Sequence, residues 1–439
     1  MDRWLELEQA IDAEALRQEN EICLIASENY MSQCVLDACG SKLINKYAEG
    51  YSGHRYYGGC SIVDKIENIA NEEARELFGC KWSNVQPNSG CQANQAVYMA
   101  LLKPGDTILA MDINSGGHIS HSLGIGFAGT FYNVVSYGLD DNGYINYDEI
   151  KEKLYEHHKL KMYQKSPRLL IVGASAYPRI IDFERIRKIV DEYNETINNV
   201  EDSLKEYAKP CYLMVDMAHI AGLVAAGVHP SPLPYADVVT STVQKTLRSG
   251  RGGLILSNDE ELGKKIDKAI FPRLQGGPLM NMIAGKAEGF AEALRPEFKL
   301  YQERVLENIQ MMITVFNDYH VKMISGGSDN HLLLLDLREE PFSGADLERV
   351  LEKIGIIVNK NAVQNDPKSK METSGVRIGT AAITTRGADN IDANDIALII
   401  CKVIQHLRNH GGIPDEFFDE AKDWVKNWCK KHPIYPEYD

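Results

Sequence analysis

The residue best placed for covalent chemistry in this sequence is Lys245. It lies in VVTSTVQKTLRSGRGG (238–253), where a β-branched run gives way to a polar, glycine-rich turn. This pattern predicts a buried strand that ends just before the lysine, beside backbone that a ligand can approach closely. Burial favours the neutral amine, which attacks carbonyl carbons. The alternative interpretation is an ordinary solvated loop lysine.

Two other polar residues follow predicted strands in the same way. Ser175 comes just after the apolar run 169–174, and Asp216 lies near the end of CYLMVDMAH (211–219). Helical patterns alternate with these strands, which indicates an α/β fold with a mainly parallel sheet. Ligands of such sheets bind at the carboxyl ends of the strands. We therefore expect Ser175, Asp216 and Lys245 to share one site.

Further residues complete a possible set for pyridoxal phosphate. Ser89 and Gly90 open a predicted helix, and a Ser-Gly turn at a helix start can bind a phosphate, although most such turns bind nothing. Asp216 could pair with a pyridine nitrogen, His118 could stack on the ring, and Arg377 in GVRIGT could bind a carboxylate. A cofactor of this kind acts as an electron sink when its ring nitrogen is protonated.

Three patterns have competing explanations. His118 and His121 are three residues apart, but no Glu or Cys stands at a supporting spacing, so we expect no metal. GIGFAG (124–129) matches a dinucleotide motif without a preceding strand, and we treat it as a decoy. Residues 45–59 are rich in tyrosine and glycine, and are either a functional ordered loop or solvated surface.

The composition narrows the class of protein. The chain has 439 residues, of which 44% are hydrophobic and 25% charged, and a net charge of −15. These values are typical of a globular protein and give no support for nucleic acid or an anionic membrane as a partner. No apolar run is long enough for a membrane span, and the amino terminus does not resemble a signal peptide. Nine cysteines without a CxxC pair indicate reduced thiols in the cytoplasm.

The order of the predicted elements suggests the domains. We expect an N-terminal arm and loop at 1–60, a large cofactor-binding domain at 61–281, and a smaller α+β domain at 282–439. A short strand before Ser27 could lead into a helix capped near residues 27–29. A long helix is predicted from 282 toward 320, with a kink at Pro296. Residues 194–209 are highly charged and are predicted to form a surface excursion between elements.

Taken in order, a dozen motifs closely resemble the serine hydroxymethyltransferase family, a group of fold-type-I pyridoxal-phosphate enzymes. The resemblance covers nearly the whole chain. The motifs are LIASENY (24–30), NKYAEGY (45–51), RYYGG (55–59), NVQPNSGCQAN (84–94), SGGHISH (115–121), SAYP (175–178), VDMAHIAGLVAAG (215–227), the lysine segment, QGGP (275–278), SGGSDNHL (325–332), VNKN (358–361) and SGVRIGT (374–380). A large domain with a mainly parallel seven-stranded sheet and a smaller C-terminal α+β domain is implied.

The resemblance also implies a role for individual residues. Lys245 would hold the cofactor covalently, Asp216 would pair with the ring nitrogen, and His118 would stack on the ring, with Thr242 beside them among the catalytic residues. The implied phosphate ligands are Ser89, Gly90, Gly276, Gly277 and the partner subunit's Tyr47, and Ser175 and His219 would contact the ring's 3′-oxygen side. The implied substrate ligands are Ser27, Arg377, Glu49 and Tyr57, and the implied folate site is Ile113, Gly117, His118, Ile119 and Asn361.

The reaction implied is reversible transfer of the serine hydroxymethyl group to tetrahydrofolate, which yields glycine and methylenetetrahydrofolate. Glu49 would transfer the proton. Because Glu49 and Tyr57 would come from the other subunit, an obligate homodimer with shared sites is implied.

The sequence also departs from the family near the lysine. The usual four threonines and histidine are here 240–244, TSTVQ, so Gln244 replaces a titratable imidazole. Other departures are Asn88, Ser52, Ala381 in GTAA (379–382) in place of GTPA, and Ser249-Gly250-Arg251 in place of Gly-Pro-Arg. Two alternatives therefore stay open. One is a folate-independent aldolase or transaldolase of 3-hydroxy amino acids, or a paralogue with a different acceptor, and the other is a non-catalytic dimeric scaffold.

Overall fold

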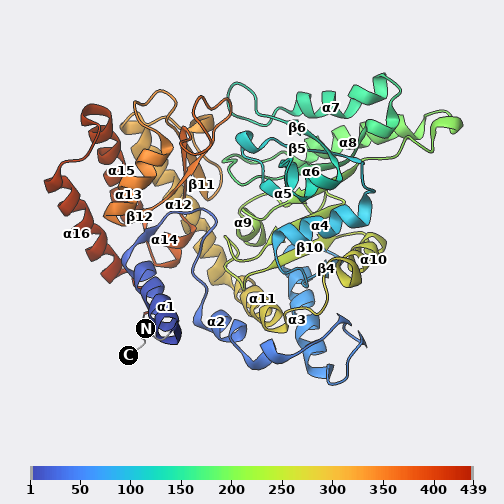
Figure 1. The fold of residues 1–439 in the computed structure, drawn as a ribbon, viewed down its shortest axis with the longest axis horizontal. Coiled ribbons are helices and arrows are strands. Elements are labelled where there is room, and N and C mark those ends of the chain that lie inside the picture. Colours follow the sequence, from blue (N-terminus) through green and yellow to red (C-terminus); the bar gives the residue numbers. More distant parts are fainter. Residues whose placement is uncertain (1–2, 437–439) are drawn as a thin grey trace. The chain divides into compact units, whose positions relative to one another are not determined.

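A computed structural model describes residues 3–436 of the chain (Figure 1). Contacts between Cα atoms group the chain into two units. One is residues 31–302, and the other combines the chain up to Tyr30 with the chain from Glu303 onward. The proposed domain limits after residues 60 and 281 stay predictions. No helix among the described residues is long and apolar enough to cross a membrane, and the cytoplasmic location stays a prediction.

The unit of residues 31–302 is built on a seven-stranded sheet. Its strand order is β4-β10-β9-β8-β7-β5-β6, and the five strands from β9 to β6 are parallel. β10 is antiparallel to both of its neighbours. The strands are β4 (Trp82–Asn84), β5 (Thr107–Met111), β6 (Asn133–Tyr137), β7 (Pro167–Val172), β8 (Tyr212–Asp216), β9 (Val238–Thr242) and β10 (Gly253–Ser257). The predicted α/β fold with a mainly parallel seven-stranded sheet is confirmed.

Both faces of this sheet are buried, as its apolar strands require. Successive side chains of a strand point to opposite faces, so Leu109 and Met111 enter one core while Ile108 and Ala110 enter another. The first core includes α3 (Ser61–Phe78), α7 (Tyr147–Lys159), α8 (Phe183–Asn198) and α11 (Met280–Ala293). The second includes α4 (Gly90–Leu101) and α10 (Glu260–Lys268). The helices therefore fix the sheet from both sides and leave its strand ends for a site.

The remaining elements of this unit are short. They are α2 (Gln33–Cys39), β2 (Gly50–Tyr51), β3 (His54–Arg55), α5 (Ile119–Ser122), α6 (Phe127–Phe131), α9 (Ala221–Ala225) and the 3₁₀ or π turns at 42–45, 113–115, 163–165, 202–204 and 269–274. Strands β2 and β3 form a small hairpin inside the predicted loop 45–59.

The second unit contains a three-stranded sheet of order β11-β14-β13 in which both pairs are antiparallel. Separately, β1 pairs with β12 in parallel, which ties the start of the chain to this unit. Its elements are α1 (Arg3–Asn20), β1 (Ile22–Cys23), β11 (Leu332–Asp336), α13 (Gly344–Ile354), β12 (Ile356–Ile357), β13 (Asn359–Asn361), β14 (Gly375–Gly379), α14 (Ala381–Thr385), α15 (Asn390–His410) and α16 (Asp415–Lys431).

Some local predictions were wrong. No helix begins near Ser27, because the next helix is α2, whose cap is Ser32. The long helix predicted from 282 is two helices, α11 and α12 (Pro296–Asp318). Proline at the start of α12 lacks only a donor that is unpaired there in any case, so it begins a helix instead of kinking one.

The boundaries of two further segments also differ from prediction. The charged segment 194–209 begins as the last turn of α8, and the segment after the GIGFAG motif begins as α6 before it enters β6.

Candidate functional site

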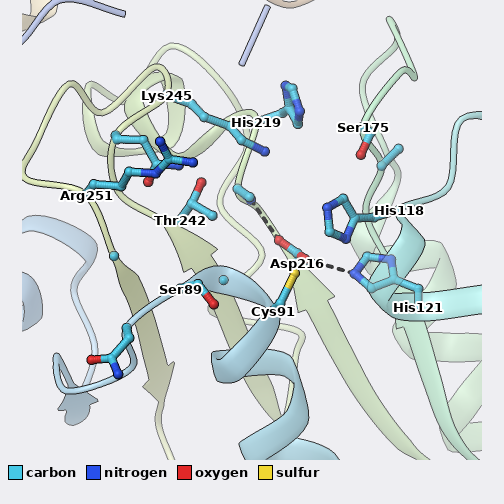
Figure 2. A pocket seen from close by; sticks show the side chains of 16 residues that line it. Ser89, Cys91, His118, His121, Ser175, Asp216, His219, Thr242, Lys245 and Arg251 are labelled. Atoms are coloured by element: carbon cyan, nitrogen blue, oxygen red, sulfur yellow. Dashed lines mark hydrogen bonds and ion pairs between the residues drawn. The ribbon is translucent and has the colours of Figure 1, made fainter. Parts of the chain in front are cut away.

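A pocket opens where strands β7, β8 and β9 end, within the unit of residues 31–302 (Figure 2). Eight residues selected from the sequence line it: Ser89, Gly90, His118, Ser175, Asp216, His219, Thr242 and Lys245. Ser175, Asp216 and Lys245 therefore lie together at one pocket, as their places after strands predicted, and their functional roles stay predictions. The remaining wall includes Asn88, Cys91, His121, Gln244, Arg251 and Gly252.

Lys245 lines the pocket from a turn that several hydrogen bonds hold in place. The turn follows β9, and the lysine is only 8% exposed. The hydroxyl of the next residue, Thr246, donates to the His219 carbonyl oxygen at 2.8 Å and accepts from the Gly222 N–H at 2.9 Å. The Ser249 N–H donates to the Val243 carbonyl oxygen at 2.8 Å, which closes the turn. A long, flexible side chain is thus anchored at its base and restricted in the directions it can take.

Asp216 is a buried carboxylate with a fixed orientation. His121 Nε2 and Asn94 Nδ2 each lie 2.9 Å from Oδ2, and the Ala218 N–H donates to Oδ1 at 3.0 Å. Burial by itself would raise the pKa of this carboxyl. The His121 hydrogen bond and charge, together with His118 and Asn94, outweigh burial and hold the pKa well below its usual range. The neighbours of Asp216 therefore favour its ionised form at the end of β8.

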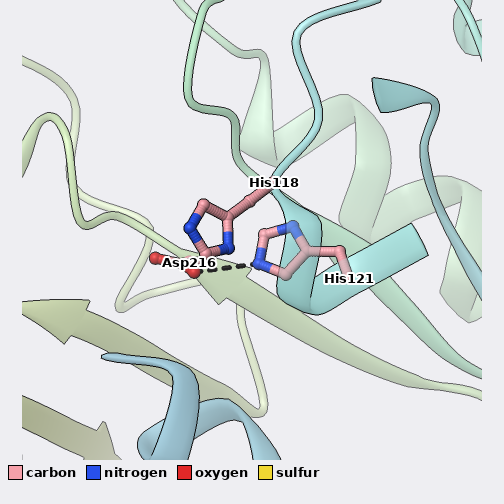
Figure 3. Close-up of side chains that lie close together, drawn as sticks. All are labelled: His118, His121 and Asp216. Carbon is pink, nitrogen blue, oxygen red and sulfur yellow. Dashed lines mark hydrogen bonds and ion pairs between the residues drawn. The ribbon is translucent and has the colours of Figure 1, made fainter. Parts of the chain in front are cut away.

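His118 and His121 lie beside this carboxylate (Figure 3). Their ring centroids are 5.3 Å apart, and the His118 Nδ1 accepts a hydrogen bond from the Ser120 N–H at 3.2 Å. The potential ligand atoms of His118, His121 and Asp216 lie within 4.8 Å of one another. The hydrogen bond between His121 and Asp216 accounts for this approach without a metal ion, and the absence of a metal stays a prediction.

The opposite wall is made by the start of α4. Ser89 is the N-cap, and its hydroxyl oxygen accepts from the Gln92 N–H at 3.2 Å. A Cβ atom at Gly90 would lie 2.5 Å from Thr242 Cγ2, so only glycine fits there. Free N–H groups and the positive end of the helix dipole make this wall suitable for an anion.

Comparison with known proteins agrees with this geometry. A sequence profile of the serine hydroxymethyltransferase family matches residues 2–400. A serine hydroxymethyltransferase from Baumannia cicadellinicola subsp. Homalodisca coagulata is 50% identical over 429 residues, which is 97% of this chain and 96% of the relative. The chain belongs to the serine hydroxymethyltransferase family. Membership confirms the resemblance seen in the motifs and the fold-type-I class.

A second group of residues selected by the family resemblance lies outside the pocket. The Tyr57 hydroxyl donates to Glu49 Oε2 at 3.2 Å, and the rings of Tyr47 and Tyr57 meet with centroids 5.5 Å apart. A Cβ atom at Gly277 would lie 2.9 Å from Tyr47, and one at Gly276 would lie 3.2 Å from Glu49. We call Tyr47, Glu49, Tyr57, Gly276 and Gly277 the loop cluster. Among the described residues that line the pocket, none belongs to it.

Ser27 and Arg377, which the resemblance implies as substrate ligands, lie in the other unit. Arg377 is in β14 and 8% exposed, its Nε donates to Asn359 Oδ1 at 3.2 Å, and burial lowers the pKa of the guanidinium to about 10. Ser27 is half-buried after β1. The binding roles of both residues stay predictions.

The implied folate residues are divided between the two units. Ile113 and Gly117 flank a turn after β5, and a Cβ at Gly117 would clash with the Met111 carbonyl oxygen at 2.2 Å. Ile119 is exposed at the start of α5, whereas Asn361 ends β13 in the other unit. The folate role of each remains a prediction.

Two residues that fix Asp216 were missed as such. His121 was weighed only as a metal ligand, although its position three residues after His118 places both on the same side of α5. Asn94 is buried and orients Asp216, and only its place one turn after Gly90 pointed to the site.

Two of the departures from the serine hydroxymethyltransferase pattern, Gln244 and Ser249, lie in different surroundings. Gln244 lines the pocket, and its buried Oε1 has no hydrogen-bond partner among the described residues. Ser249 is buried against α11, and its hydroxyl donates to the Lys286 carbonyl oxygen at 3.2 Å. Gln244 therefore faces ligand space, whereas Ser249 belongs to the packing behind it.

Proposed function

We propose that this chain is a pyridoxal-phosphate enzyme that transfers the hydroxymethyl group of serine to tetrahydrofolate, with glycine as the other product. The observation that carries the proposal is one pocket with a lysine, a buried ionised carboxylate and a glycine-rich helix start. Membership of the serine hydroxymethyltransferase family supports the same reaction.

The residues of the pocket fit such a cofactor. A pyridinium nitrogen requires a carboxylate that stays charged, and Asp216 meets that need. A phosphate requires N–H donors, which the start of α4 offers at Ser89 and Gly90. The Thr242 hydroxyl oxygen is also buried without a partner among the described residues, as expected of a group reserved for a ligand.

Each residue then has a physical task. Lys245 would hold the cofactor through its amine, and Asp216 would hold a proton at the ring nitrogen. When bound, pyridoxal phosphate supplies an electron sink for the charge that develops at the amino acid's Cα. His118 would lie against the face of the ring and help to orient it, and Ser175 and His219 would contact its oxygen substituent.

Substrate recognition involves residues of both units. Arg377 and Ser27 bind the carboxylate of serine, and Arg377 is suited to a bidentate contact. Glu49 transfers the proton at the hydroxymethyl group, with Tyr57 donating a hydrogen bond to it. Ile113, Gly117, Ile119 and Asn361 face the folate.

We further propose that two copies of the chain form a homodimer with shared sites. Glu49 and Tyr57 lie in the exposed loop cluster, and apolar side chains near it are exposed as well, among them Ile44, Tyr56 and Ile62. Exposed apolar side chains gathered around polar functional groups are typical of an interface. The loop cluster of one subunit would complete the pocket of the other, with Tyr47, Gly276 and Gly277 near the phosphate.

The test is the visible absorbance of the purified protein as glycine and then tetrahydrofolate are added, followed by an assay of serine formation. We expect a yellow protein that develops a new, strong band only with both ligands. A yellow protein indifferent to folate would instead favour the aldolase or transaldolase, for which the Gln244 departure is the motive. A colourless protein that binds no pyridoxal phosphate would overturn the proposal in favour of a scaffold.

A further inference from the structure

Lys286 is a buried lysine that the proposed reaction does not use. It lies in the middle of α11 and is 2% exposed. Lysine is almost never fully buried without a partner, because its ammonium loses its hydration. A residue that bears this cost requires an explanation from its surroundings.

The partners of its ammonium are three backbone carbonyl oxygens. Nζ donates to Val85 at 2.6 Å, to Gly253 at 2.9 Å and to Pro87 at 3.0 Å. An ammonium group has three N–H donors and no acceptor, so three carbonyls satisfy it. Burial lowers the pKa of Lys286 to about 7, while the charge of Glu67 opposes that shift.

These carbonyls belong to two segments that meet at the pocket wall. Val85 and Pro87 precede the helix start at Ser89, and Gly253 follows the lining residue Gly252. The Gly253 N–H also donates to the Pro87 carbonyl oxygen at 2.9 Å, so Lys286 braces an existing junction.

The lysine side chain lies directly behind the wall. A Cβ atom at Gly252 would lie 2.3 Å from Lys286 Cε and 2.6 Å from its Nζ. Helix α11 also holds the same segment through its backbone, since the Gly250 N–H donates to the Gly285 carbonyl oxygen at 3.3 Å. The side chain therefore fixes the backbone from behind without entering the pocket, and its protonated form, which the three carbonyl acceptors favour, places a positive charge behind the anion-binding wall.

We propose that Lys286 is a positioning residue for the cofactor phosphate. It holds the segment leading to Ser89 against the segment that carries Gly252, and so sets the direction of the N–H donors at the start of α4. This inference rests on the proposed function, because it requires pyridoxal phosphate in the pocket. It predicts that loss of Lys286 weakens recognition of the phosphate selectively and leaves recognition of the ring largely intact.

The experiment compares pyridoxal phosphate with pyridoxal, which lacks the phosphate. Dissociation constants for both are measured on the full-length protein after removal of cofactor, for the wild type and Lys286→Met. We expect Lys286→Met to weaken pyridoxal phosphate binding by about 10- to 100-fold, the usual range for loss of charged hydrogen bonds, and pyridoxal binding by less than about threefold. Lys286→Gln retains two N–H donors, so its dissociation constant for pyridoxal phosphate should lie between those of the wild type and Lys286→Met. It serves in place of Lys286→Met if that variant does not fold.

The matched control is Ile283→Ala, which truncates a buried apolar side chain on the same helix. It should affect both ligands by the same factor, because its effect is on packing alone. An equal loss of both ligands in the Lys286 variants, or no loss, would overturn the phosphate role while the proposed function stood. A wild type that binds no pyridoxal phosphate would overturn the proposed function itself.

Discussion

The pocket and the loop cluster carry comparable chemical groups in opposite environments. Lys245 and Asp216 lie deep at strand ends with neighbours that fix them, whereas Tyr47 and Tyr57 are 58% and 47% exposed. A low-dielectric pocket can hold a charge in a set direction, but a half-buried carboxylate such as Glu49, beside exposed tyrosines, is partly screened by water. Under the proposed function, the difference means that one chain builds most of the cofactor site, and that the loop cluster of a second copy supplies the proton-transfer group and completes the phosphate site.

The largest effect, loss of covalent cofactor attachment, should come from Lys245 in the pocket. Lys245→Ala removes the amine that attaches the cofactor, so borohydride reduction followed by mass spectrometry should find no adduct. Lys264→Ala, on the exposed side of α10, is the control and should retain the wild-type adduct. A reducible adduct that persists in Lys245→Ala would place covalent attachment elsewhere.

Asp216 tests whether the buried charge itself matters. Asp216→Asn keeps the shape but removes the charge, and we expect kcat to fall by on the order of 100-fold or more, as for loss of one preorganised electrostatic contact. Asp267→Asn is the matched control, because Asp267 is another largely buried carboxyl of the same unit, with a pKa that burial raises to about 6. Similar losses in both variants would attribute the effect to folding.

Arg377 extends the comparison to a buried group of the other unit. Arg377→Ala removes a bidentate contact to the serine carboxylate, so steady-state kinetics should show KM for serine raised on the order of 100-fold. Arg377→Lys keeps the charge but loses the planar pair of donors, and should recover only part of the loss. An unchanged KM in Arg377→Ala would mean that the carboxylate is bound elsewhere.

The smallest effect is expected at Gln244, the departure that faces the pocket. Gln244→His restores an imidazole where the amide oxygen lacks a partner among the described residues. We expect folate-dependent kcat/KM to rise, by less than about tenfold, since one neutral hydrogen bond is at stake. A collapse of activity would show instead that the glutamine belongs to a redesigned site.

Much of the pocket could be predicted from the sequence, for a physical reason. The strands before Ser175, Asp216 and Lys245 are apolar runs, and the carboxyl ends of parallel strands meet at one edge. Ser89 and Gly90 could be placed because a cap and a tight turn leave a local signal.

The remaining features depend on contacts between distant segments. The bond from Asn94 to Asp216 and the three carbonyls around Lys286 join residues far apart in sequence, and no local pattern encodes them. Two local features were also missed. The amphipathic pattern of α16 was not recognised as a helix, and the start of a new helix at Pro296 was predicted as a kink.

The most direct test of the central claim is complementation between two variants that are inactive alone. Lys245→Ala disables the pocket and Glu49→Gln the loop cluster, so a mixed dimer with shared sites contains one intact site and one doubly defective site. Co-refolding equal amounts gives mixed dimers in about half of the population, so the account predicts about a quarter of wild-type hydroxymethyl transfer. No activity in the mixture, with mixed dimers demonstrated by mass spectrometry, would contradict it and assign each site to a single chain.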